Sequence, residues 1–110
     1  MIHSIKITGE TAASGTHLRH VVRINNIPWL FTFRELEILQ SLTTGIQKGT
    51  PWVHRGEWGG DHAAYEVMHR LRKQLRMLPM LGGGEHIENN GDGYYRLINH
   101  SNIEVDMNGA

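Results

Sequence analysis

The stretch that decides the fold is TFRELEILQSL, Thr32 to Leu42. Thr32 is followed three residues later by Glu35, the spacing of a capping box, in which each side chain accepts a hydrogen bond from the other residue's backbone N–H. Apolar side chains then recur at helical spacing, at Phe33, Leu36, Ile38, Leu39 and Leu42. The stretch therefore predicts a helix that begins after Thr32 and ends at Gly45.

The residues before this helix are typical of strands. IHSIKITG near the N-terminus alternates apolar and polar positions loosely, and residues 10–15 are small and polar, as in a loop. HLRHVVRI (17–24) and IPWLF (27–31) flank Asn25 and Asn26, two residues that tolerate a tight turn. We therefore expect a small antiparallel sheet in the first 31 residues.

A second long helix is predicted from Asp61 to Met77, with Asp61 as its N-cap. Its apolar side has helical spacing, at Ala64, Val67 or Met68, Leu71, Leu75 and Leu78. The opposite side is polar and mostly basic, with His62, Glu66, His69, Arg70, Lys73 and Arg76. Pro79 and the glycines at 82–84 are expected to stop the helix.

Two shorter elements complete the prediction. VHRGEWGGD, between the long helices, has room for a short helical turn at most. NGDG at 90–93 sits between two β-rich runs and is the strongest hairpin signal in the chain. Residues 99–110 are polar and are expected to form a flexible tail after a single domain at 1–98.

This order of elements resembles the C-terminal DNA-binding domain of OmpR/PhoB-type response regulators. The matching pieces are NNIPWLFTFRELEIL, WVHRGEW, VMHRLRKQL and NGDGYYRL. The resemblance implies an α+β winged helix–turn–helix fold: a small N-terminal antiparallel sheet, three helices and a C-terminal hairpin wing. It also implies a transcriptional regulator whose helix 61–77 enters the major groove. The loop that often meets RNA polymerase in this family is reduced here to about GGD.

Composition excludes several classes of protein. The chain has 110 residues, with 39% hydrophobic and 20% charged residues, which is typical of one folded domain. There is no apolar run long enough to span a bilayer and no signal-peptide pattern. Without cysteines there is no disulfide framework and no thiolate metal site, which favours the cytoplasm. The formal net charge is +0, so overall charge predicts no partner.

The predicted DNA contacts lie in three places. Arginine and lysine donate to guanine edges and phosphates, which assigns this role to the polar face of the long helix. The residues are His62, Glu66, His69, Arg70, Lys73 and Arg76. His54 and Arg55 precede the short helical turn and are expected at the backbone, and Asn90 is expected at the minor groove or a phosphate.

Each assignment has a structural alternative. A basic helix face is often only solvated, and Glu66 can form an i,i+4 ion pair with Arg70. Arg72 can pair with Glu35 or Glu37 of the first helix. Trp52 and Trp58 are expected to pack in the core.

Two further function classes remain open. A protein-binding module fits the neutral net charge, because non-specific DNA affinity comes mainly from basic charge. A metal site at His62, Glu66 and His69 is disfavoured by the neighbouring cations. No nucleophile motif or phosphate-binding glycine loop is present, so we expect no enzyme and no cofactor. The prediction is sequence-specific binding of double-stranded DNA, with RNA polymerase or a regulatory protein as a further class of partner and the oligomeric state open.

Overall fold

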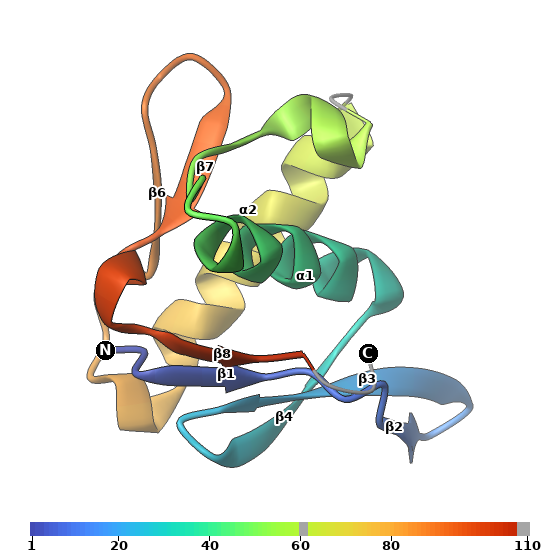
Figure 1. Ribbon diagram of the computed structural model, residues 1–110. Coiled ribbons are helices and arrows are strands. Elements are labelled where there is room, and N and C mark those ends of the chain that lie inside the picture. Colours follow the sequence, from blue (N-terminus) through green and yellow to red (C-terminus); the bar gives the residue numbers. More distant parts are fainter. Residues whose placement is uncertain (60–61, 108–110) are drawn as a thin grey trace.

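The computed structural model describes residues 1–59 and 62–107, which form two sheets and two α-helices (Figure 1). The first part contains β1 (Ser4–Lys6), β2 (Thr11–Ser14), β3 (His17–Ile24), β4 (Ile27–Phe31), α1 (Phe33–Gln47), β5 (Val53–His54) and the 3-10 helix η1 (Arg55–Trp58). The second contains α2 (His62–Met77), η2 (Pro79–Leu81), β6 (Ile87–Asn89), β7 (Tyr94–Leu97), η3 (His100–Asn102) and β8 (Glu104–Asp106).

The larger sheet is organised around β3. The first half of β3 pairs with β2, and its last two residues pair with β1 along the same edge. β4 pairs antiparallel along the other edge. β8 adds to β1 in parallel, with Ser4 opposite Glu104, which completes a five-stranded sheet.

The turn between β3 and β4 is the two-residue turn expected at Asn25 and Asn26. Both asparagines have positive φ, at 52° and 68°, the backbone that matches the twist of the flanking strands. The Asn25 side chain also accepts hydrogen bonds from the backbone N–H groups of His3 and Ser4. The turn thereby fixes the N-terminal segment as well as the hairpin.

The start of α1 confirms the capping box. The Glu35 N–H donates to Thr32 Oγ1 at 3.2 Å, and the Thr32 N–H donates to Glu35 Oε1 at 2.8 Å. The predicted end at Gly45 is wrong, since α1 continues to Gln47. Gly45 is buried where the chain turns back, and a Cβ there would lie 2.7 Å from the Thr50 carbonyl oxygen. Position 45 is therefore a glycine because the Thr50 backbone packs too closely against it for a side chain.

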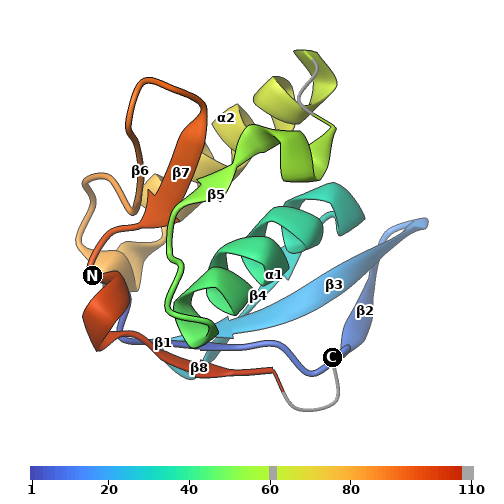
Figure 2. The same cartoon turned by 45° about the horizontal axis from the view of Figure 1, so that its top comes forward.

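α1 lies between the two sheets and also packs against α2 (Figures 1 and 2). One continuous core joins these elements, and its largest fully buried side chains come from both sheets and both helices. They are Ile2, Ile5, Ile7, Ile24, Phe31, Ile38, Leu39, Leu42, Leu71, Leu75, Ile87 and Leu97.

The predicted winged helix–turn–helix fold with three helices and a small N-terminal sheet is wrong. Residues 55–58 form only a single 3-10 turn, which Gly59 ends with a φ of 100°. The N-terminal sheet has five strands, because β2 replaces the loop expected at 10–15 and β8 joins from the other end of the chain. The hairpin β6–β7 is confirmed, but β5 pairs with β7 and makes it a three-stranded sheet. The domain is α+β with two α-helices in the described residues.

The region expected to be a tail, 99–110, also contributes to the fold where it is described. Ile103 is buried, and β8 follows it in the larger sheet. The Asn99 side chain donates a hydrogen bond to the Ile2 carbonyl. Residues 99–107 therefore belong to the same unit as the N-terminal strands.

Helix length bears on the question of membrane insertion. Within 1–59 and 62–107, neither α1 nor α2 combines the length and the apolar composition that crossing a bilayer requires.

Candidate nucleic-acid interface

α2 has one buried face and one exposed face, as its spacing predicts. Ala64, Val67, Met68, Leu71 and Leu75 are buried. Five of the predicted contact residues lie together on the exposed face: His62, Glu66, His69, Arg70 and Lys73. The predicted N-cap, Asp61, lies outside the described residues, as does most of the short loop at 59–61.

The pairing of charges on this face differs from the expected one. Glu66 pairs with His62 at 3.3 Å, in place of the expected pair with Arg70. Tyr65 is exposed and stacks on the His62 ring, with centroids 6.4 Å apart. In the described part of the chain, no carboxylate forms an ion pair with Arg70 or Lys73. These two cations are therefore available to a ligand.

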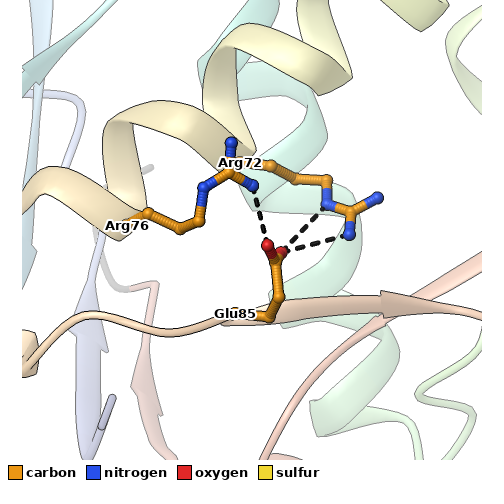
Figure 3. A network of polar contacts seen from close by, with 3 residues as sticks. All are labelled: Arg72, Arg76 and Glu85. Carbon is orange, nitrogen blue, oxygen red and sulfur yellow. Dashed lines mark hydrogen bonds and ion pairs between the residues drawn. The ribbon is translucent and has the colours of Figure 1, made fainter.

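Arg72 and Arg76, on the flank of α2, are both held by Glu85 (Figure 3). Arg72 donates through Nη2 at 3.1 Å and through Nε at 3.4 Å to Oε2, and Arg76 donates through Nη1 at 2.8 Å to Oε1. The expected pairing of Arg72 with Glu35 or Glu37 is wrong. Arg76 is one of the predicted contacts, but in this structure its guanidinium pairs with Glu85, a carboxylate that it shares with Arg72.

The electrostatics of Glu85 follow from these contacts. Partial burial by itself raises the pKa of the carboxyl, but hydrogen bonds and charges from Arg72 and Arg76 outweigh it and hold the pKa below its ordinary value of 4.5. Glu85 is thus charged at neutral pH, and it links the end of α2 to the segment that leads into β6.

A second group of predicted contacts gathers where η1 meets the β6–β7 turn. The Arg55 N–H donates to the Gly93 carbonyl at 2.8 Å. Gly93 has a φ of +85°, and a Cβ there would lie 3.2 Å from both Arg55 Nε and His54 Nε2. His54 Nδ1 also accepts from the Gly56 N–H, so His54 caps η1. Arg55 remains exposed beside the turn.

Asn90 has a structural role inside this turn. Its Oδ1 accepts from the backbone N–H groups of Asp92 at 2.8 Å and Tyr94 at 3.2 Å. The two tryptophans that were expected in the core differ in burial. Trp58 is buried, as predicted. Trp52 is half-buried, and the Arg96 guanidinium lies over it, 4.2 Å from the centroid of the Trp52 ring.

The β6–β7 turn, η1 and the start of α2 lie toward the same end of the molecule, away from the five-stranded sheet (Figures 1 and 2). The second group of predicted contacts lies at this end, whereas Arg70 and Lys73 lie further along α2, beside Trp29 of β4. Among residues 1–59 and 62–107, no three His, Asp or Glu side chains are placed to hold a metal ion.

Three relevant residues escaped the sequence reasoning. They are Glu85, which pairs with two arginines, Tyr65, which stacks on His62, and Met77, which is 70% exposed. The i,i+4 spacing of Arg72 and Arg76 was the available signal for Glu85, because it places both arginines on one flank for a shared carboxylate.

Comparison with known proteins adds nothing to this picture: no family model, no curated protein and no solved structure matches the chain.

Proposed function

We propose that this domain binds double-stranded DNA in a sequence-specific manner and acts in transcriptional control in the cytoplasm. α2 would lie in the major groove, with Arg70 and Lys73 as its principal contacts. It is a binding function, without a cofactor or a catalytic step. A regulatory protein or RNA polymerase would be an additional partner in this role.

The observation that carries the proposal is the exposed face of α2. Arg70 and Lys73 lie one turn apart on it and have no anionic partner within the described residues. Arginine can donate two hydrogen bonds to a guanine edge, and lysine can neutralise a phosphate. Sixteen residues give α2 a length of about 24 Å, and a helix of ordinary diameter fits a major groove about 12 Å wide.

The second group of contacts supports the same docking. Arg55 is exposed beside Gly93, so its guanidinium can reach a phosphate next to the turn. Contacts of this kind set the orientation of a protein on the duplex without reading sequence. His54 caps η1 and Asn90 holds the β6–β7 turn, each through hydrogen bonds from backbone N–H groups, so their part in DNA binding would be indirect.

The proposal is tested by titrating labelled random duplex DNA at several salt concentrations, followed by selection of a preferred site. Arg70→Ala should weaken binding to the selected site by about 1–3 kcal/mol and relax its specificity. Arg19→Ala, in the half of β3 that pairs with β2, removes the same charge outside the groove residues and serves as the matched control. If the wild-type protein shows no salt-dependent binding to duplex DNA, the proposed function is wrong.

A further inference from the structure

A groove of about 360 Å³ lies between β4 and the C-terminal half of α2. Six residues line it: Trp29, Arg70, Lys73, Gln74, Met77 and Leu78. Leu78 is buried and Trp29 is half-buried, whereas Met77, Arg70 and Lys73 are exposed. The groove thus combines an apolar lining with two cations that have no carboxylate partner in the described chain.

The groove is poorly suited to the DNA backbone. A duplex offers phosphates to Arg70 and Lys73, but its sugar–phosphate surface has no bulky apolar group to fill the space beside Trp29 and Met77. An exposed methionine adapts to apolar side chains of varied shape, which is why it recurs at peptide-binding surfaces. The lining therefore favours a protein ligand.

The edge of β4 shows how such a ligand would bind. β4 is an edge strand of its sheet, but Pro28 has no N–H to donate, and the Leu30 carbonyl already accepts from Gln74 Nε2 at 2.9 Å. A partner strand would find few free backbone groups there. A ligand at this site would instead be held by its side chains.

We propose that this groove binds a short acidic segment of a partner protein. One bulky apolar side chain of the segment, such as Leu or Phe, inserts between Trp29 and Met77. Aspartate or glutamate side chains on either side of it pair with Arg70 and Lys73. Charge complementarity selects this occupant, because the cations stand beside the apolar lining and have no carboxylate partner among the described residues.

The groove shares Arg70 and Lys73 with the proposed DNA contacts. If the domain binds DNA as proposed, the acidic segment and the duplex exclude each other, and the partner acts as an antagonist of DNA binding. This competition rests on the proposed function. Peptide binding itself does not.

The test uses the whole chain labelled with ¹⁵N and an acetylated, amidated peptide of sequence Glu-Glu-Leu-Phe-Glu-Glu. The protein has three tryptophans, whose indole N–H signals can be followed separately, and Trp29→Phe assigns the signal in the groove. The peptide should shift the Trp29 signal in a saturable way. Two control peptides should each bind at least roughly tenfold more weakly. In one, glutamines replace the glutamates, and in the other, alanines replace Leu and Phe.

Met77→Gln should lower the affinity for the peptide roughly tenfold, the factor expected when burial of one apolar side chain is lost. Because Met77 is 70% exposed, the substitution should leave the fold intact. Leu18→Gln replaces another exposed apolar residue, on β3, and should leave peptide affinity unchanged. Equal affinity of wild type and Met77→Gln, equal binding of the glutamine peptide, or an unmoved Trp29 signal would each overturn the proposal.

Competition with duplex DNA separates the two proposals. Displacement of the duplex by the peptide supports both. Duplex binding without peptide binding overturns the peptide site and leaves the proposed function in place. Peptide binding without duplex binding supports the peptide site and overturns the proposed function.

Discussion

Replacing Glu85 by Gln should lower stability and strengthen DNA binding at the same time. The amide keeps the shape of the side chain but removes the charge that holds Arg72 and Arg76. All three side chains are partly exposed, so the two ion pairs together should contribute only about 0.5–1 kcal/mol to the free energy of unfolding. This loss should appear as a small decrease in the urea midpoint.

The effect on DNA binding should have the opposite direction, so that affinity rises. Each released arginine that reaches a phosphate should steepen the slope of log affinity against log salt by about 0.9, so both together give up to about 1.8. Arg72 and Arg76 hold the pKa of Glu85 below 4.5, so its charge is constant near neutral pH. The gain should therefore be the same throughout that range. Fluorescence anisotropy with a labelled random duplex at four or five salt concentrations measures the slope.

Glu10→Gln is the matched control. Glu10 pairs with Arg23 at 3.3 Å, away from Glu85 and its arginines, and its side chain is 44% exposed, as is that of Glu85. Its replacement changes the net charge equally without releasing a cation on α2. If Glu85→Gln leaves the slope as Glu10→Gln does, the two arginines do not reach phosphates and the reasoning about α2 and its flank is refuted.

Three further changes test the fold. Thr32→Ala should lower the free energy of unfolding by about 1 kcal/mol, because the first turn of α1 loses its cap. Gly45→Ala should destabilise by about 1–3 kcal/mol although alanine favours helices, since its Cβ would meet the Thr50 carbonyl at 2.7 Å. His86→Asn should remove part of the acid sensitivity of the fold. Burial and the positive N-terminus hold the pKa of His86 below its ordinary 6.5, so stability is full above that pH and is lost as pH falls through the lower folded-state pKa.

Urea denaturation at pH values of about 7.5 and 5.5 measures all three changes. An unchanged midpoint for Thr32→Ala would mean that the cap contributes nothing, and a raised midpoint for Gly45→Ala would mean that the loop at Thr50 relaxes freely. If His86→Asn loses as much stability in acid as wild type does, the burial of His86 is not the source of that loss.

Features set by neighbouring residues could be predicted from the sequence. The cap at Thr32, the turn at Asn25 and Asn26 and the hairpin around 90–93 each depend on residues within a few positions of one another. The two-sided character of α2 followed from its 3.6-residue spacing in the same way.

Features set by distant contacts could not. From the sequence, Gly45 is typical of a helix end. The structure shows instead that the Thr50 carbonyl packs against it and leaves no room for a side chain. Glu104–Asp106 has no strand signal of its own, and it becomes β8 because the free edge of β1 lies beside it. For the candidate site, the exposed face of α2 was predicted correctly, but the pairing of Glu85 with Arg72 and Arg76 needed the fold to bring the segment before β6 against the helix.

The parallel pairing of β1 with β8 also affects synthesis on the ribosome. β1 is made before β8, which follows about 100 residues later in the chain. At roughly 5–20 residues per second, that edge of β1 waits about 5–20 s for its partner. During that interval its backbone groups on that side stay open to water and to other chains. The hairpins β2–β3 and β3–β4 can form early, but the five-stranded sheet is completed only when residues 104–106 have left the ribosome.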